Sequence, residues 1–311
     1  LCARCTRFSD EISGDPLIEF IQRGNKTEVN TFPDEPFRSY FSGNTVQICP
    51  VGALTSTSYR FKARPWDLKK VSSTCNCCSV GCSIELNTSQ NKMLRILGED
   101  NEFTNQGWLS DKGRYNFDYL HSENRVLNIL NKSEDSFNEI SISEAMAKIK
   151  NKIDELDNPN VKFLLGSSST NEEYFVINEI GNYLNKDKFL SRDSSNIYFG
   201  DDLLFEGYFG DQYSQAKLED LDNSETIVVW AEDIKDNLPI LYLRIKKAVK
   251  NGSKLIVFGH TNTSIAGLAD FYFGADIVSN KFELIRNPNE IEDLKNNIEG
   301  KKVTVIAGKS T

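Results

Sequence analysis

The sequence predicts a mixed α/β protein built from three parts. These are a loop-rich segment with cysteines, a small β-rich region, and an α/β region with a mainly parallel sheet. Two observations separate the parts. All seven cysteines lie within the first 82 residues. From about residue 123, compact apolar runs alternate with amphipathic ones, as strands alternate with helices in α/β folds. The expected domain boundaries are therefore 1–67, 68–122 and 123–311.

The first part, residues 1–67, shows little hydrophobic periodicity. It contains several Pro, Gly and aromatic residues together with Cys2, Cys5 and Cys49. This composition is typical of a segment held together by ligands more than by repeating secondary structure.

The second part, residues 68–122, contains four cysteines within the eight residues CNCCSVGC, which run from Cys75 to Cys82. The stretches CSIELNT and KMLRILG follow. Their alternation of apolar and polar residues predicts short antiparallel strands around a metal site.

The third part, residues 123–311, begins with a strand and a helix. VKFLLG (161–166) is a compact apolar strand, and NEEYFVINEIGNYL is an amphipathic helix. Thr170 as N-cap with Glu173 three positions later predicts a capping box at the start of this helix.

A clearer strand–helix–strand unit follows as ETIVVWAED, NLPILYLRIKKAVKNG and KLIVFG. Asn237 is the expected N-cap of this helix, Pro239 suits its first turn, and Gly252 suits its exit. KVTVIAG (302–308) predicts a further strand. Helix-linked strands that are apolar on both faces indicate a parallel sheet covered by helices.

Charge and composition exclude several functions. The net charge of -9 argues against nucleic-acid binding, since phosphates would repel such a surface. No apolar run approaches the length of a membrane span. There is no G-x-G-x-x-G motif to support NADH binding, and the terminal GKST lacks the first glycine of a P-loop.

The chain opens on Leu1 within a cysteine motif, which predicts an internal fragment of a longer protein.

The cysteine spacings point to metal ligation in a reducing compartment, because an odd number of cysteines confined to one region is not a disulfide framework. Cys2 and Cys5 form a C-x2-C pair, and Cys49 directly precedes Pro50, as in iron–sulfur ligand runs. A thiolate two residues before Leu1 would complete four ligands. A structural zinc with the same missing thiolate is the alternative. Cys75, Cys78 and Cys82 form a C-x2-C-x3-C set that suits either zinc or a four-iron cluster.

Longer motifs are more specific. CARCTRFSDEISG, FSGNTVQICPVGALTSTSYRFKARPWDL, C-x2-C-x3-C and SDKGR together resemble the family of large iron–sulfur subunits of bacterial NADH-quinone oxidoreductase, respiratory complex I, in an actinobacterial-like form. The resemblance is close over residues 1–120. It continues more weakly through the α/β region, which is similar to the molybdopterin oxidoreductase domain.

This resemblance implies a [4Fe–4S] cluster on Cys2, Cys5 and Cys49, with the fourth ligand upstream of residue 1. A [2Fe–2S] centre is expected only in the region that precedes the chain. The resemblance also implies that residues 1–67 end an iron–sulfur domain of the His/Cys type. Residues 68–122 would form a [4Fe–4S] domain of the Mo/W-bis-MGD type, and the rest part of a molybdopterin-oxidoreductase-like domain.

A second cluster in this family follows C-x2-C-x3-C-x27-C. Counting from Cys82, the last position is Ser110, so the chain departs from the pattern. Three outcomes stay open: Ser110 ligates as an alkoxide, Cys77 substitutes, or the site is empty or three-liganded.

The implied function is an electron relay from NADH and FMN toward quinone, coupled to ion translocation by the complex. The chain would have no NADH site, and its partners would be other subunits of the peripheral arm, including the FMN- and NADH-binding one. It would lie at the cytoplasmic face of the bacterial membrane. The alternative is a molybdopterin-dependent oxidoreductase of the formate dehydrogenase class, in which Lys112 lies between cluster and pterin. No cysteine follows Cys82 to ligate the metal of such an enzyme, whereas a serine ligand stays open at Ser191, Ser194 or Ser195. Bound pterin is not expected.

Overall fold

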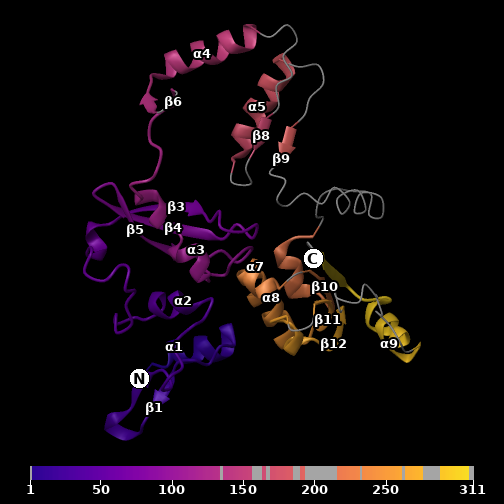
Figure 1. Cartoon of the computed structure of the whole chain (residues 1–311). Coiled ribbons are helices and arrows are strands. Elements are labelled where there is room, and N and C mark those ends of the chain that lie inside the picture. Colours follow the sequence, from indigo (N-terminus) through magenta and orange to yellow (C-terminus); the bar gives the residue numbers. More distant parts are fainter. Residues whose placement is uncertain are drawn as a thin grey trace. The chain divides into compact units, whose positions relative to one another are not determined.

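A computed structural model describes most of the chain (Figure 1). The described residues are 2–133, 136–155, 163–165, 169–184, 190–192, 216–231, 233–260, 263–275 and 288–307. The chain divides into two compact units, Leu1–His121 with Tyr213–Thr311, and Ser122–Gln212. The three-part division expected from the sequence draws other boundaries and stays a prediction. The mixed α/β class with a parallel sheet is confirmed.

The N-terminal segment of the first unit consists of short elements joined by loops. Its π-helix ends at Gly14, which has a φ of 74°, and the buried Ser13 hydroxyl donates to the carbonyl oxygen of Ser9 at 2.7 Å. The elements in chain order are α1 (Arg4–Arg7), η1 (Phe8–Ser13), β1 (Glu19–Ile21), η2 (Gly24–Lys26), β2 (Glu28–Asn30), α2 (Ser42–Gln47) and η3 (Pro65–Asp67).

A three-stranded antiparallel sheet follows, with the order β3-β4-β5. It comprises β3 (Lys69–Thr74), β4 (Ser83–Ser89) and β5 (Lys92–Gly98), which confirms the two predicted strands. Gln90 and Asn91 both have positive φ, as a two-residue hairpin turn requires. The sheet leads into α3 (Asp111–Tyr115) and η4 (Asp118–His121).

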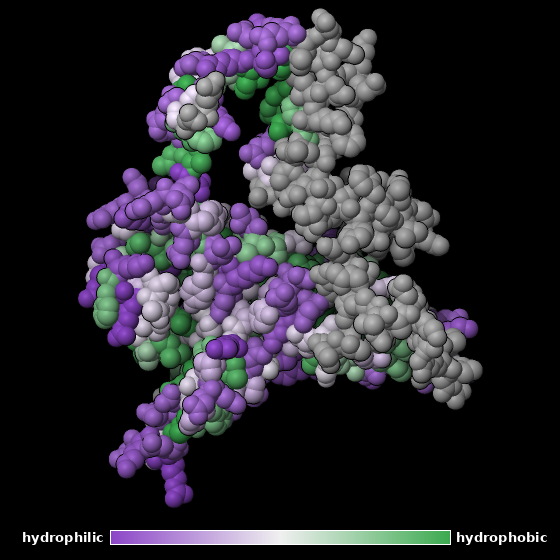
Figure 2. Space-filling model, viewed as in Figure 1, coloured by the Kyte–Doolittle hydropathy of each residue, from purple (hydrophilic) through white to green (hydrophobic). Residues whose placement is uncertain are grey.

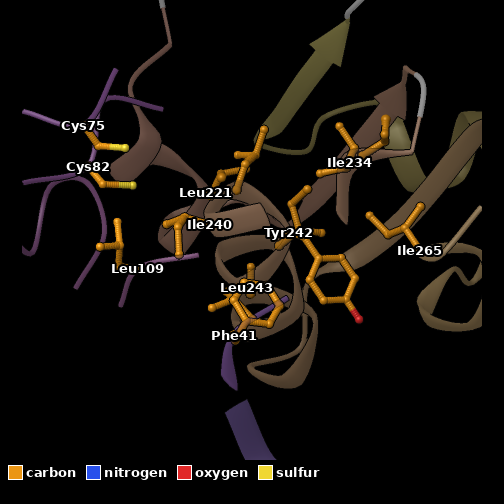
Figure 3. Packing of buried hydrophobic residues seen from close by; sticks show 14 of the residues in the cluster. Phe41, Cys75, Cys82, Leu109, Leu221, Ile234, Ile240, Tyr242, Leu243 and Ile265 are labelled. Carbon is orange, nitrogen blue, oxygen red and sulfur yellow. The ribbon is translucent and has the colours of Figure 1, made fainter. Parts of the chain in front are cut away.

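The C-terminal part of the first unit contains the predicted parallel sheet, with the strand order β12-β11-β10-β13. Ile227 and Val229 on β10 and Leu255 and Val257 on β11 are almost completely buried, and they form a core with α8. Figure 3 shows Ile240, Tyr242 and Leu243 of α8 in this cluster. The elements are η6 (Leu218–Asn223), β10 (Thr226–Trp230), α7 (Ile234–Asn237), α8 (Pro239–Lys250), β11 (Lys254–His260), η7 (Ala266–Leu268), β12 (Phe271–Ala275), α9 (Pro288–Ile298) and β13 (Val303–Ala307).

The predicted cap of the long helix is wrong. Asn237 is the last residue of α7, a one-turn helix whose N-cap Asp233 accepts a hydrogen bond from the backbone N–H of Lys235. The N-cap position of α8 is therefore Leu238, and Pro239 starts the helix as expected. Gly252 leaves the helix with a φ of 109°, in agreement with its predicted role.

Within its described residues, the second unit contains a β-hairpin, two helices and a short parallel pair of strands. Thr170 and Glu173 form the predicted capping box, with hydrogen bonds of 2.8 and 3.2 Å between side chains and backbone N–H groups. Its elements are β6 (Leu130–Lys132), β7 (Phe137–Glu139), α4 (Ile142–Asp154), β8 (Phe163–Leu165), α5 (Asn171–Leu184) and β9 (Leu190–Arg192).

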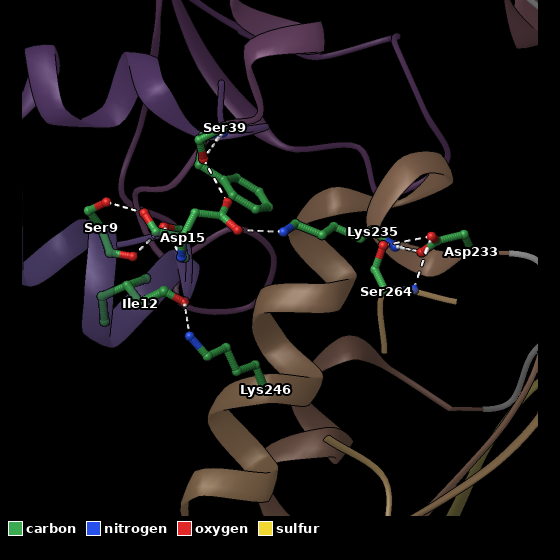
Figure 4. A network of polar contacts seen from close by, with 10 residues as sticks. Ser9, Ile12, Asp15, Ser39, Asp233, Lys235, Lys246 and Ser264 are labelled. Atoms are coloured by element: carbon green, nitrogen blue, oxygen red, sulfur yellow. Dashed lines mark hydrogen bonds and ion pairs between the residues drawn. The ribbon is translucent and has the colours of Figure 1, made fainter. Parts of the chain in front are cut away.

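A polar network ties the N-terminal segment to α7 and α8 within the first unit (Figure 4). The Lys235 ammonium contacts Asp15 at 2.6 Å, and both side chains are 15% exposed. Asp15 also accepts from the Ser39 hydroxyl at 2.8 Å, and Lys246 donates to the carbonyl oxygen of Ile12. Charge and hydrogen bonding thus hold together segments that are far apart in the sequence.

Polar side chains cover most of the described surface that Figure 2 shows. Among the described helices, none has the length and apolarity needed to cross a membrane.

Candidate metal centres

The first cysteine group is assembled from two short helices. Cys5 lies in α1, which packs against α2, and α2 ends two residues before Cys49. Cys2 is exposed, whereas Cys5 and Cys49 are partly buried. The fold thus brings together the two segments that carry the predicted ligands.

The backbone of the turn that follows Cys49 affects the pKa of its thiol. Leu54 has the largest effect, and Val51, Ala53 and Gly52 act in the same direction. Together they lower the pKa of Cys49, although partial burial acts in the opposite direction. Hydrogen bonds that stabilise a thiolate are what an anionic iron–sulfur ligand requires, so the CPVGAL turn suits a cluster-bound cysteine.

The second cysteine group lies on the hairpin loop between β3 and β4. The backbone N–H of Cys75 donates to the carbonyl oxygen of Cys82 at 2.8 Å, so the two ends of the loop remain paired. The side chains of Cys75 and Cys82 lie side by side, close to Leu109, and their sulfur atoms point the same way (Figure 3). Cys77 and Cys78 are partly buried in the same loop.

Burial makes these thiols hard to ionise. It raises the pKa of Cys75 and of Cys78, and it raises the pKa of Cys82 to about 12. The neighbouring cysteines raise the pKa of Cys82 further, because each thiolate repels the next. A metal at this loop must therefore displace protons from neutral thiols.

Ser110 lies next to this loop, where the family pattern has its last cysteine. It is the N-cap of α3, and its hydroxyl oxygen accepts from the backbone N–H of Gly113 at 3.2 Å. A Cβ added to Gly113 would lie 2.9 Å from the Cys75 sulfur and 3.5 Å from the Ser110 oxygen. The structure therefore brings Ser110 and Cys75 together, and it gives the Ser110 hydroxyl a structural role in capping.

Within the described residues, no group of three or more His, Cys, Asp or Glu side chains is arranged to bind a metal ion. Cluster binding would therefore require the cysteine side chains to turn toward a common centre. Both ligand sets stay predictions.

A buried polar network that joins α2 to Leu109 and Asp111 was not anticipated from the sequence. The Asn44 side chain on α2 bonds both backbone groups of Leu109, accepting at 3.1 Å and donating at 2.8 Å. Asp111 on α3 accepts from the backbone N–H groups of Ser42 and Gly43 at 2.9 and 2.8 Å. A polar residue in the middle of an otherwise small-residue helix, as in FSGNTVQ, was the available indication.

The remaining candidates play smaller parts. Lys112 is exposed, and its charge acts to lower the pKa of Cys78 against the stronger effect of burial. His121 accepts a hydrogen bond from the backbone N–H of Met93 through Nε2, which is a structural contact. Ser191 lies in β9, whereas Ser194 and Ser195 are outside the described residues.

Comparison with known proteins defines the class. A family model described as molybdopterin oxidoreductase matches residues 82–285, about two thirds of the chain, and the chain belongs to this family. A second model, described as the ferredoxin-like domain of NADH-quinone oxidoreductase subunit 3, matches residues 1–55.

Individual relatives confirm the resemblance seen in the motifs. The chain is 50% identical over 126 residues to the NADH-quinone oxidoreductase G subunit of Streptomyces coelicolor, a match that covers 40% of the chain and 15% of that protein. It is 56% identical over 119 residues to the G subunit of Mycobacterium bovis, covering 38% and 15%. It is also 30% identical over 260 residues to the NADH-ubiquinone oxidoreductase 75 kDa subunit of Reclinomonas americana. This longer match covers 81% of the chain and 38% of that protein.

The chain thus spans well under half the length of these relatives. Among solved structures, acetylene hydratase from Pelobacter acetylenicus matches with a TM-score of 0.53 and 20% identity, over 66% of this chain and 29% of that one. This similarity shows the fold alone.

Proposed function

We propose that the chain is an iron–sulfur electron-relay part of an NADH-quinone oxidoreductase. Cys2, Cys5 and Cys49 would be three of four thiolate ligands of a [4Fe–4S] cluster, with the fourth preceding Leu1. When bound, such a cluster accepts and donates one electron at a time. The observation that carries the proposal is the match of residues 1–55, which contain all three cysteines, to the ferredoxin-like domain of NADH-quinone oxidoreductase subunit 3. The lowered pKa of Cys49 supports it, because a cluster ligand must be a thiolate.

The chain's own residues would bind and tune the cluster, and NADH and FMN chemistry would belong to partner subunits of the peripheral arm. Electrons would pass onward to quinone, coupled to ion translocation by the assembled complex at the cytoplasmic face of the membrane. Residues 1–67 would end a His/Cys-type iron–sulfur domain, 68–122 would form a domain of the [4Fe–4S] Mo/W-bis-MGD type, and 123–311 would provide scaffold.

For the second group we propose that Cys75, Cys78 and Cys82 do not hold a complete four-thiolate site in this chain. Ser110 supports this assignment, since its hydroxyl accepts from Gly113 and caps α3. A pterin is not part of the proposal.

Anaerobic reconstitution of the full-length chain tests the proposal, with iron and sulfide counts and low-temperature EPR. Cys49→Ser should remove the signal of the first cluster, whereas Cys77→Ser, a matched change at a cysteine outside the ligand set, should leave it intact. Stoichiometric zinc without iron would identify a zinc-stabilised interaction protein instead. Stoichiometric molybdenum or tungsten would favour the formate dehydrogenase class.

A further inference from the structure

Arg114 on α3 is buried without an ion-pair partner. The residue is 4% exposed, and its Nε has no hydrogen-bond partner. The two remaining guanidinium nitrogens donate to neutral oxygens, the carbonyl of Ile96 at 3.2 Å and the Asn44 side chain at 2.9 Å. Within the part of the chain that the structure describes, no carboxylate forms an ion pair with it.

A buried cation of this kind is unusual, because removal of a charge from water is unfavourable unless an opposite charge compensates. Asp111 acts on Arg114 only through space, since its carboxylate accepts from the N–H groups of α2. Arg244, another fully buried arginine, shows the usual arrangement. It is 2% exposed, and it contacts the Asp222 carboxylate at 3.0 Å. Arg114 therefore lacks the carboxylate partner that Arg244 has, and a negative charge from another group is needed to compensate it.

The position of Arg114 indicates where that charge would come from. On one side, α3 presents Gly113 to the Cys75 sulfur of the second cysteine group. On the other side, a Cβ on Gly43 of α2 would collide with Arg114, within 2.5 Å of both Cδ and Nε. The guanidinium thus lies against α2, the helix that leads into Cys49.

The contact between α2 and α3 is held by several hydrogen bonds. Asn44 links Arg114 to the backbone of Leu109, and Asp111 accepts from the first N–H groups of α2. Because these bonds join the two helices around the guanidinium, Arg114 has little freedom to turn toward solvent. Its charge is therefore fixed in a low-dielectric region against α2, the helix that ends two residues before Cys49.

We propose that Arg114 is a positioning residue whose buried charge compensates the negative charge of a cluster held by Cys2, Cys5 and Cys49. The inference rests on the proposed function. An added electron makes a thiolate-bound cluster more negative, and a fixed nearby cation favours that reduced form, more strongly in low dielectric than in water. Arg114 thus raises the reduction potential of the cluster.

The test is a redox titration of the reconstituted full-length chain, followed by EPR. Arg114→Met removes the cation and should lower the ratio of reduced to oxidised cluster about tenfold at a fixed ambient potential, equivalent to about 59 mV for one electron. Asp111→Asn removes the anion on the same helix and should shift the ratio in the opposite direction. Arg244→Met removes an equally buried arginine on α8, which is bonded to Glu102, Leu218 and Asp222, and should leave the ratio unchanged.

Shifts of opposite sign in the ratio of reduced to oxidised cluster distinguish the electrostatic role from structural damage. Loss of packing would shift this ratio in the same direction in Arg114→Met and in Asp111→Asn. Equal shifts, or none, would overturn the inference. If Arg114→Met binds no iron, the inference is decided by two other variants. Arg114→Lys keeps the positive charge, and Asp111→Asn removes the negative charge on the same helix. A wild-type chain without iron and sulfide would instead refute the proposed function.

Discussion

Replacing Ser110 by cysteine tests whether the second cysteine group lacks only one ligand. The residue is 5% exposed and lies beside Cys75, so a thiol at this position would face the loop that carries the other three sulfurs. The substitution changes one atom, from oxygen to sulfur. If the loop still has the shape of a cluster site, Ser110→Cys should bind about four additional iron atoms per chain, as a second cubane cluster requires.

The change also has a structural cost that can be worked out from the cap. Ser110 accepts from the Gly113 N–H at 3.2 Å, and sulfur is a poor acceptor for such a bond. Loss of an N-cap lowers the free energy of unfolding by about 1 kcal/mol. Ser110→Ala loses the same cap but gains no ligand, so it is the matched control.

Iron and sulfide counts, EPR and urea unfolding should be measured on both variants. We expect both metal-free variants to unfold at similar urea concentrations, and Ser110→Cys alone to gain a second EPR signal after reconstitution. If Ser110→Cys folds but binds no more iron than Ser110→Ala, the loop of Cys75, Cys78 and Cys82 has lost more than a ligand.

Two further outcomes follow from charge and burial. Lys235→Met removes the ion pair of the buried Asp15 carboxylate, to which the Ser39 hydroxyl still donates, and should lower the free energy of unfolding by about 2–4 kcal/mol in urea titrations. The double variant Lys235→Met with Asp15→Leu should recover part of this loss, and no recovery would mean that the pair is not coupled. In the reduced, metal-free fold the pKa of Cys82 is raised to about 12, so folding favours its protonated thiol. This contribution to stability is fully present below about pH 9 and is lost as the pH rises toward about 12. Between pH 8 and pH 10.5 the wild type should lose about 2 kcal/mol more than Cys82→Ala, and equal losses would contradict the assignment.

Local patterns in the sequence were enough to predict many of the elements. The alternating patterns in CSIELNT and KMLRILG predicted β4 and β5, and the Thr170–Glu173 spacing predicted the start of α5. These features depend on contacts between residues near one another in the chain, so the amino-acid pattern contains the necessary information. The predicted N-cap of α8 was wrong because Asn237 belongs to α7, a short helix that the sequence pattern did not predict.

The contacts around the candidate sites depend on tertiary structure and were not predictable. Nothing local distinguishes Arg114 from an exposed arginine, since its burial follows from the packing of α3 against α2. Cysteine spacing predicted two ligand sets, which stay predictions, and counting 27 positions from Cys82 pointed to Ser110, which the structure places close to Cys75. The effect of the CPVGAL turn on the pKa of Cys49, in contrast, became visible only with the backbone of that turn.

The ion pair between Asp15 and Lys235 has a consequence for the order of events during synthesis. The two residues are 220 positions apart. At about 5–20 residues per second, a ribosome needs roughly 10–45 s to reach Lys235 after Asp15. During that interval the segment that carries Cys2 and Cys5 lacks its contact with α7 and α8. The N-terminal cysteines therefore emerge early but reach their final surroundings late, which leaves a period in which their thiols are open to oxidation or to delivery of iron.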